Sequence, residues 1–284
     1  MTGPDMVATP PVALTLAGSD SSGGAGIQAD LRTFTALGVY GASVVTALTA
    51  QNTCGVSGVL GVPQGFVTQQ IDAVFADLDI RAAKTGMLGD RQTVSTVADG
   101  IARHGLKSVV VDPVMIATSG DVLLSPDAIA AVRLRLAPLA LVLTPNLQEA
   151  ARLLDEDVAH DIDTMERQAR ALLALGCHSV LVKGGHGSGD EAVDVLAIRG
   201  DRAAEVHRFS APRIATNNTH GTGCTLSAAI AARLALGDAL VASVAAAKSY
   251  LTAALASGAS MRIGRCNGPV DHLFAIRGTQ RPGV

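Results

Sequence analysis

The chain of 284 residues is compatible with one large α/β domain, and with 48% hydrophobic and 17% charged residues it can bury a sizeable core. Because Trp is absent and Tyr and Phe number only 2 and 5, a platform that stacks nucleic-acid bases is not expected. The net charge of −3 likewise argues against a basic surface that binds nucleic acid.

The N-terminus, the apolar stretches and the cysteines favour a cytoplasmic protein. Residues 1–18 lack a basic region before their short apolar run, unlike a secretory signal, and residues 1–11 are expected to form a flexible N-terminus. The most apolar stretch, residues 226–247, is broken by Arg233 and Asp238, so no membrane span is expected. The cysteines show neither a CxxC pair nor the spacing of a disulfide framework, so we expect reduced thiols at positions 54, 177, 224 and 266.

Apolar runs alternate with helical patterns along the chain. Residues 12–17 form the first run, a helical pattern follows over 27–37, and a second run covers 42–47. Later strands are expected at 108–111, 139–143 and 179–182, and helices at about 92–104, 126–136 and 163–175, with Pro126 after Ser125 as a favourable helix start. This alternation predicts one α/β domain over residues 1–284, with a central, mostly parallel β-sheet flanked by helices on both faces.

Three successive expected strands end in polar residues. These are Asp112 after the first strand, Thr144, Asn146 and Glu149 after the second, and Lys183 after the third. The carboxyl ends of parallel strands meet at one edge of a sheet, where ligands bind, so these side chains are expected to converge. Each has a structural alternative, because Asp–Pro is a common turn, Asn146 and Glu149 suit a helix cap, and Lys183 could be solvated. Their shared position favours a ligand site.

The first of two glycine-rich segments, residues 18–30 (GSDSSGGAGIQAD), joins a strand to a helical pattern. It matches neither a Walker A loop nor a well-spaced GxGxxG motif. It indicates either a flexible turn or a loop that lets a small ligand approach the backbone, with Asp20 and Asp30 as polar anchors.

The second segment, residues 217–224 (NNTHGTGC), leads into a long Ala- and Leu-rich helix that begins near Cys224. Free backbone N–H groups and the positive end of the helix dipole at residues 221–224 would suit a transferring phosphoryl group, although a plain helix start capped by Thr222 is the alternative. A thiol at a helix N-terminus has a lowered pKa, so Cys224 is a candidate proton acceptor. Cys54 and Cys177 lack such a setting and are expected to be packing thiols.

Seven motifs, in order over about residues 12–272, resemble the hydroxymethylpyrimidine/phosphomethylpyrimidine kinases of thiamine biosynthesis, which belong to the ribokinase-like superfamily. They are AGSDSSGGAGIQAD, TALTAQNT, KTGMLGD, DPVM followed by TSGD, TPNLQEA, VLVKGGH and NTHGTGCTLSAAI. The GTGC motif is the most specific, because most ribokinase relatives have Asp where this chain has Cys224. The resemblance implies a ribokinase-like fold, a homodimer, and two successive phosphorylations that use ATP and Mg²⁺. The first would act on the 5-hydroxymethyl group of 4-amino-5-hydroxymethyl-2-methylpyrimidine, and the second on the monophosphate.

The resemblance also implies roles on the pyrimidine side. Gln51 would read the aminopyrimidine edge, because an amide carries a donor and an acceptor side by side. The remaining pocket positions around the ring would be Gly18, Ala25, Asp30, Met87 and Val114.

On the nucleotide side, the resemblance implies that Asp112 and Glu149, with Asn146, hold Mg²⁺ and its waters. The residues implied to contact ATP are Lys183, Thr144, Asn146 and Gly221. Those implied to form the catalytic anion hole are Gly221, Thr222, Gly223 and Cys224. Cys224 would accept the proton of the alcohol in the first phosphorylation, whereas the phosphate acceptor of the second is already ionised.

Four features depart from the family or leave a role open. In the tail IGRCNGPVDH, Cys266 replaces a glycine that is common in the family, and we treat it as incidental. Lys248 matches a family lysine near the adenine, with a solvated helix residue as the alternative. His220 either orients the anion loop or is structural, and residues 186–192 are a candidate mobile flap.

Three other functions remain open. A pyridoxal or pyridoxine kinase would share the fold and a similar hydroxymethyl substrate. A general sugar kinase would normally carry Asp in place of Cys224. A non-catalytic sensor of thiamine precursors would not need Asp112, Asn146, Glu149 and Lys183 together with an anion loop.

Overall fold

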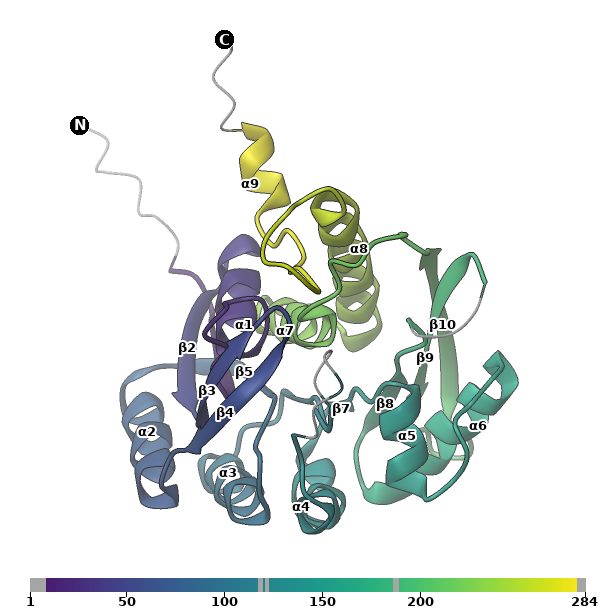
Figure 1. The fold of residues 1–284 in the computed structure, drawn as a ribbon. Helices are drawn as coiled ribbons and strands as arrows, with labels where there is room; N and C mark the ends of the chain where they lie inside the picture. The colour runs from purple at the N-terminus through teal and green to yellow at the C-terminus, as the bar shows by residue number, and fades with distance from the viewer. Residues whose placement is uncertain (1–8, 117–119, 121–122, 186–188, 280–284) are drawn as a thin grey trace, which may run out of the picture.

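The structure, a computed structural model, describes residues 9–116, 120, 123–185 and 189–279. At its centre is an eight-stranded sheet with the order β10-β9-β8-β7-β6-β5-β1-β2 (Figure 1). The strands are β1 (Val12–Ala17), β2 (Tyr40–Val45), β5 (Ile80–Thr85), β6 (Val109–Val111), β7 (Val142–Leu143), β8 (Ser179–Val182), β9 (Glu191–Ile198) and β10 (Glu205–Pro212). In this sheet, β8, β7, β6, β5, β1 and β2 pair in parallel, whereas β9 and β10 are antiparallel to their neighbours.

Helices cover both faces of this sheet (Figure 1). On one face lie α1 (Gly26–Ala36), α7 (Thr222–Ala235) and α8 (Leu240–Gly258). On the other lie α2 (Gln64–Asp77), α3 (Arg91–His104), α4 (Pro126–Ala131), α5 (Leu147–Leu154) and α6 (Ile162–Leu172), and a short α9 (Phe274–Thr279) lies near the C-terminus. This arrangement confirms the predicted α/β fold class with a mostly parallel sheet.

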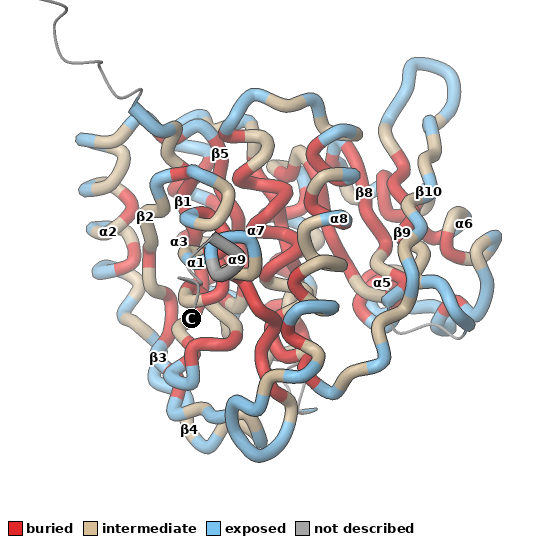
Figure 2. Tube along the Cα trace, turned by 90° about the horizontal axis from the view of Figure 1, so that it is seen from above, coloured by how far each residue is buried: buried red, intermediate tan, exposed pale blue. Residues whose placement is uncertain are grey.

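The core is aliphatic, as the scarcity of aromatic residues requires. The central strands are buried on both faces, which explains why segments such as Val109–Val111 are uninterrupted apolar runs. On α7, the small side chains of Ala228, Ala229, Ala231 and Ala232 are fully buried, so this helix packs closely on the sheet. Figure 2 shows the buried residues concentrated along the strands and α7.

A separate hairpin, which the sequence did not reveal, follows β2. Its strands β3 (Ala47–Asn52) and β4 (Gly55–Gly61) form a two-stranded antiparallel sheet. The run expected at 42–47 ends as a strand of the main sheet at Val45, because the chain turns at Thr46 into the hairpin. The hairpin begins at the carboxyl end of β1, since Thr46 N donates to Ala17 O and Ser19 N donates to Ala47 O.

Two other elements differ from their predicted form. The expected helix 126–136 begins at Pro126 with Ser125 as its N-cap, but it continues beyond Ala131 as a π-helical turn, Val132–Leu136. The expected strand 139–143 is reduced to Val142–Leu143, because a 3₁₀ turn that contains Pro138 occupies Ala137–Leu139. By contrast, Val12–Ala17 and Ser179–Val182 are strands with the predicted bounds.

The apolar stretch 226–247 is divided in the structure between α7 and α8. Within the described residues, α8 is the one helix that length and composition alone would allow to cross a membrane. It packs against α7 and β10, and its Lys248 ammonium lies 2.7 Å from Oδ2 of Asp194 on β9. Lys248 is therefore a buried ion-pair partner and not the solvated helix residue of the alternative interpretation.

The expectation of four reduced thiols is wrong for two of them in this structure. Cys54, at the turn between β3 and β4, forms a disulfide with Cys266. The two residues are 212 positions apart, so no local spacing indicates the bond. They meet because the C-terminal loop folds back over the hairpin turn, where Asn267 N donates to Thr53 O at 3.1 Å. Cys177 is buried in the core, as expected.

Candidate active site

The polar residues that follow β6, β7 and β8 converge at one edge of the sheet, as predicted. The Lys183 ammonium lies 2.8 Å from Oδ1 of Asp112 and 3.9 Å from Oε2 of Glu149. The hydroxyl of Thr144 donates to Oδ1 of Asp112 at 3.3 Å. Burial would raise the pKa of Asp112, but the charges of Lys183 and Lys84 hold it below its ordinary value. This edge therefore combines a buried carboxylate with a nearly buried ammonium.

Asn146 and Glu149 form the helix cap that was the structural alternative, and Glu149 also faces the polar cluster. They form a capping box at the start of α5, in which Asn146 Oδ1 accepts from Glu149 N and Glu149 Oε2 accepts from Asn146 N. The same Glu149 carboxyl faces Lys183. Burial, together with the nearby charge of Asp112, raises the pKa of Glu149 to about 7 against the attraction of Lys183. The helix cap thus holds in place a glutamate whose pKa is raised toward neutral pH.

The start of α7 lies against this cluster. A Cβ atom on Gly223 would be 3.4 Å from Nζ of Lys183 and 3.8 Å from Oδ2 of Asp112, and Ser227 Oγ donates to the latter oxygen at 3.1 Å. Gly221 is the N-cap residue with φ of 80°, so Thr222 is the first residue of the helix and not its cap. Residues 221–224 therefore present a helix N-terminus beside an ammonium group, which is the arrangement an anion requires.

The pKa of Cys224 is shifted in the opposite direction to the one expected. Burial raises the pKa of the thiol, and the carboxylates of Asp30 and Asp112 add to this effect. The ammonium of Lys84 and a hydrogen bond from the backbone of Gly26 act in the other direction. The helix N-terminus therefore does not by itself determine the ionisation of Cys224, because two buried carboxylates lie close to it.

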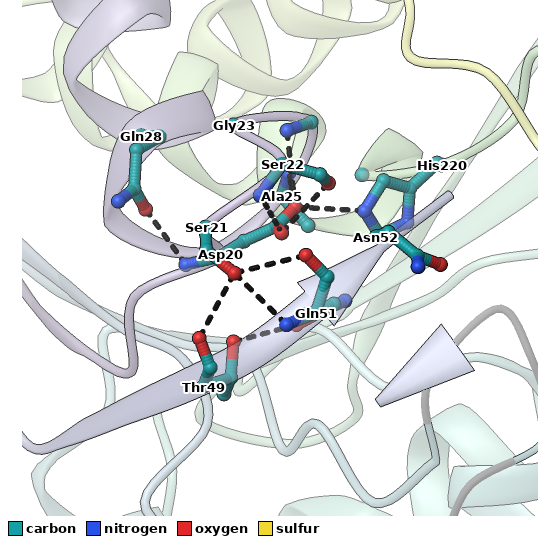
Figure 3. Close-up of polar contacts among 12 residues, drawn as sticks. Asp20, Ser21, Ser22, Gly23, Ala25, Gln28, Thr49, Gln51, Asn52 and His220 are labelled. Atoms are coloured by element: carbon teal, nitrogen blue, oxygen red, sulfur yellow. Dashed lines mark hydrogen bonds and ion pairs between the residues drawn. The ribbon is translucent and has the colours of Figure 1, made fainter. Parts of the chain in front are cut away.

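The loop of residues 18–30 is anchored by its own aspartate (Figure 3). Oδ2 of Asp20 accepts from the N–H groups of Gly24 and Ala25 at 3.0 and 2.8 Å, and Oδ1 accepts from Ser22 N at 2.9 Å. His220, from the second glycine-rich segment, lies 2.8 Å from Asp20 Oδ2. Burial opposes ionisation, but these hydrogen bonds hold the pKa of Asp20 well below its usual range. Asp20 thus binds the loops to each other and is not free to anchor a ligand.

The two loops also pack by direct backbone contact. A Cβ atom on Gly221 would lie 1.9 Å from Gly24 O, so only glycine fits at this contact, and its positive φ adds to the requirement. His220 N donates to Gly268 O at 3.0 Å, which joins the C-terminal loop to the same assembly. His220 therefore makes a structural contact that holds the loop before α7 to Asp20.

The hairpin brings Gln51 to the glycine loop. Ser21 Oγ accepts from Gln51 N at 2.8 Å, and Thr49 Oγ1 lies 3.0 Å from Gln51 Oε1 (Figure 3). At the base of the hairpin, Gly18 N donates to Met87 O, and a Cβ atom on Gly18 would be 3.2 Å from Met87 Sδ. Gly18 and Met87 are therefore direct neighbours, and Gln51 is bonded to the loop that follows Gly18; Val114 N donates to the backbone oxygen of Asp112.

The similarity to known proteins agrees with this geometry. The model of the family described as phosphomethylpyrimidine kinase matches residues 20–271. The chain belongs to the phosphomethylpyrimidine kinase family. It is 58% identical over 261 residues to a hydroxymethylpyrimidine/phosphomethylpyrimidine kinase of Rhizobium meliloti, covering 92% of this chain and 96% of that protein.

Two solved structures place this family member among kinases of the same fold. The phosphomethylpyrimidine kinase from Clostridium difficile 630 is 43% identical, with a TM-score of 0.73 over 85% of this chain and 98% of that one. The pyridoxal kinase of Bacillus subtilis, solved as an ADP complex, is 38% identical, with a TM-score of 0.85 over 94% of this chain and 99% of that one.

Sequence reasoning missed Lys84, the lysine of the family motif KTGMLGD. Its side chain is fully buried in β5, and the ammonium lies 2.9 Å from both carboxylate oxygens of Asp30. Burial would lower the pKa of Lys84, but the charge of Asp30 holds it above its ordinary value. A lysine within an apolar strand was the available signal, because a buried ammonium requires a carboxylate partner.

This ion pair changes the expectation for Asp30. Its carboxylate has no exposed surface and accepts from Thr15 Oγ1 at 2.6 Å, so it is turned away from any ligand. The flap expected at 186–192 is described only in part, since residues 186–188 lie outside the described residues and Glu191 and Ala192 belong to β9.

Proposed function

We propose that this chain transfers the γ-phosphoryl group of ATP to the 5-hydroxymethyl group of 4-amino-5-hydroxymethyl-2-methylpyrimidine. A second transfer, to the resulting monophosphate, gives the diphosphate used in thiamine diphosphate synthesis. Membership of the family and the name of the Rhizobium meliloti relative support this activity. The structural observation that carries the proposal is the position of Gly223, at the start of α7, beside Lys183 and Asp112.

For the nucleotide, we assign contacts to Lys183, Thr144, Asn146 and Gly221. The Lys183 ammonium would move from Asp112 toward the phosphates, where it acts as a point charge. The backbone N–H groups of residues 221–224 would stabilise charge that develops on the transferred phosphoryl group. Because phosphoryl transfer depends mainly on positioning and on charge stabilisation, these fixed groups would supply most of the rate enhancement.

Asp112 and Glu149 fit a Mg²⁺ ion that binds together with ATP. Mg²⁺ prefers oxygen ligands and is usually held by one or two carboxylates plus substrate phosphates. Asp112 and Glu149 supply two buried carboxyl groups next to Lys183, and across the described residues no group of three His, Cys, Asp or Glu side chains forms a cage of its own. Bound there with the nucleotide, the ion would neutralise phosphate charge.

For the pyrimidine, we assign the edge contact to Gln51 and the ring contacts to Gly18, Ala25, Met87 and Val114. Asp30 would contribute to this site only indirectly, because its carboxylate is paired with the ammonium of Lys84. In the first phosphorylation, the Cys224 thiolate would accept the proton of the alcohol. Burial makes this thiolate scarcer but also a stronger base, and the ammonium of Lys84 favours its formation.

The direct test measures ATP consumption with the pyrimidine alcohol and with its monophosphate, and resolves the products by mass. We expect both the monophosphate and the diphosphate to appear. Failure to phosphorylate either compound, despite tight binding of both, would support a sensor instead.

A pyridoxal or pyridoxine kinase is the second candidate, because the pyridoxal kinase of Bacillus subtilis shares the fold at a TM-score of 0.85. The comparison of kcat/KM for pyridoxine and for the pyrimidine alcohol separates the two. We expect the pyrimidine alcohol to be the better substrate.

We also propose that the chain is a single kinase domain and forms a homodimer. Leu48 and Leu60 are paired across the β3–β4 hairpin and form an apolar patch, with 49% and 67% of their surfaces exposed. Such an apolar patch suits a second copy of the chain. Light scattering after size exclusion should give twice the chain mass for the wild type and a smaller mass for L60D.

Finally, we propose a cytoplasmic location. The cytoplasm supplies ATP and keeps thiols reduced, so the Cys54–Cys266 bond would be open there.

A further inference from the structure

The hydroxyl of Thr49 has two neighbours that, as placed, can only accept a hydrogen bond. Thr49 Oγ1 lies 2.8 Å from the backbone oxygen of Ser19 and 3.0 Å from Oε1 of Gln51. A hydroxyl carries one proton and can donate to only one of them. With the amide in this orientation, one of the two close oxygen pairs would have no proton between them.

Turning the Gln51 amide by 180° removes this conflict. The oxygen and nitrogen of a glutamine amide are distinguished only by their hydrogen-bond partners, so the assignment follows from the network. With Nε2 toward Thr49, the amide donates to Oγ1, and the hydroxyl donates its own proton to Ser19 O. Both short contacts of the Thr49 hydroxyl, of which Figure 3 draws the one to Gln51, are then hydrogen bonds with a proton.

The groups around the amide are held in place. Ser19 N donates to Ala47 O at 2.8 Å, which fixes the peptide whose oxygen accepts from Thr49. Ser21 Oγ accepts from Gln51 N at 2.8 Å, which fixes the backbone of Gln51 against the same loop. Thr49 itself is only 8% exposed. The Gln51 amide can therefore still rotate about its terminal torsion, and its hydrogen bond with the Thr49 hydroxyl fixes that rotation.

We propose that Thr49 is a specificity-determining residue that fixes the direction of the Gln51 amide, and thereby selects a ring with an amino group next to an unprotonated ring nitrogen. This inference rests on the proposed pyrimidine kinase function. An amide held in one direction presents an acceptor and a donor in a fixed order. The 4-amino pyrimidine offers the complementary donor and acceptor, whereas the 4-oxo analogue, protonated on the adjacent nitrogen, offers them in reverse. To accept the oxo ring the amide must turn, and the hydroxyl must then give up its bond to Ser19 O.

The test compares kcat/KM for 4-amino-5-hydroxymethyl-2-methylpyrimidine and for its 4-oxo analogue. We expect the amino-to-oxo ratio to fall at least about tenfold in T49V, because the amide is then free to turn, and to remain within about threefold of wild type in T49S. T33V is the matched control, since Thr33 is also buried and donates to a backbone oxygen, that of Ala29, but lies on α1. Its ratio should equal that of the wild type.

The outcomes separate this inference from the function on which it rests. An unchanged ratio in T49V, with both kcat/KM values reduced equally, means that Thr49 is merely structural and overturns the inference. A wild-type protein that phosphorylates neither ring overturns the proposed function instead. The amide direction is also measurable without turnover, or if T49V does not fold. In wild-type protein with ¹⁵N-labelled glutamine, the Gln51 NH₂ protons should show a nuclear Overhauser effect to the Thr49 side chain, and its absence in an assigned spectrum contradicts the inference.

Discussion

The imidazole Nε2 of His220 lies 2.8 Å from Oδ2 of Asp20, although the two residues are 200 positions apart in the chain. This contact joins the loop after β1 to the loop before α7. On the pyrimidine side, the first loop carries the Ser21 hydroxyl, which accepts a hydrogen bond from Gln51 N. On the nucleotide side, the second loop ends at Gly223 beside Lys183. The buried hydrogen bond between Asp20 and His220 therefore ties together the two halves of the candidate site.

D20N should destabilise the protein and weaken binding of both substrates. Asp20 is 2% exposed, and the substitution leaves His220 and two backbone N–H groups facing a neutral amide. Loss of hydrogen bonds to a buried carboxylate costs roughly 3 kcal/mol, measurable by denaturant unfolding. KM for ATP and for the pyrimidine should rise together. D72N is the control, because Asp72 forms its ion pair with Arg103 on the surface. A loss in D20N no larger than that in D72N would contradict this role for Asp20.

C224A should slow the first phosphorylation much more than the second. The alcohol acceptor must lose a proton, whereas the phosphate acceptor is already ionised near neutral pH. Single-turnover rates with the alcohol and with the monophosphate measure the two steps separately. We expect a loss on the order of a hundredfold in the first step and less than tenfold in the second. C177A, at the buried cysteine away from the site, serves as the control. Equal losses in both steps would show that Cys224 is not the proton acceptor.

Much of the fold could be predicted because its signals are local. The strand at Ser179–Val182 is a short apolar run, and the helical pattern expected at about 92–104 corresponds to α3, Arg91–His104. The edge of the sheet that carries the candidate site could be predicted in the same way, since Asp112 and Lys183 directly follow parallel strands. Each of these inferences needs only a few consecutive residues and the geometry of a parallel sheet.

The parts that could not be predicted depend on contacts between distant residues. Lys84 and Asp30 are 54 positions apart, and nothing near Asp30 indicates that it faces an ammonium and not a ligand. The raised pKa of Cys224 has the same origin, because its causes lie on other elements. The β3–β4 hairpin was missed for a different reason. Its strands have exposed residues such as Leu48 and Leu60 and few buried ones, so the alternation typical of a half-buried strand is weak.

The Cys54–Cys266 disulfide should stabilise the protein under oxidising conditions. It ties the hairpin turn to the C-terminal loop across 212 positions, so opening it releases a long loop in the unfolded chain. Reduction should lower the free energy of unfolding by roughly 2 to 5 kcal/mol, the upper figure being the chain-entropy value for so long a loop, as measured by unfolding with and without dithiothreitol. The C54S/C266S double variant should not respond to the reductant. A wild-type protein that, oxidised and denatured, still titrates with four thiols would show that the bond does not form.

His272 should contribute a loss of stability as the pH decreases below neutrality, against an opposite contribution from Glu149, whose raised pKa favours the protonated carboxyl of the folded protein. Burial, with a smaller contribution from Arg32, lowers the pKa of His272 from 6.5 to about 4. Its Nε2 lies 3.0 Å from Thr225 Oγ1, and that hydroxyl donates to Gly221 O at 2.8 Å. The hydroxyl proton is thereby used, so Nε2 of His272 must carry the proton of the neutral ring. The folded protein consequently favours one neutral tautomer of this histidine.

The sign of the effect follows from proton uptake. Between pH 6.5 and 4 the unfolded chain binds a proton at His272 that the folded chain does not, so the free energy of unfolding decreases as the pH falls. The loss attributable to this residue reaches roughly 3 kcal/mol at the acid end. H272Q, whose amide nitrogen can replace Nε2 as the donor to Thr225, should be less sensitive across this range, whereas H160N at an exposed histidine should follow the wild type. Denaturant unfolding at half-unit pH intervals measures the difference, and parallel curves for wild type and H272Q would exclude His272 as its source.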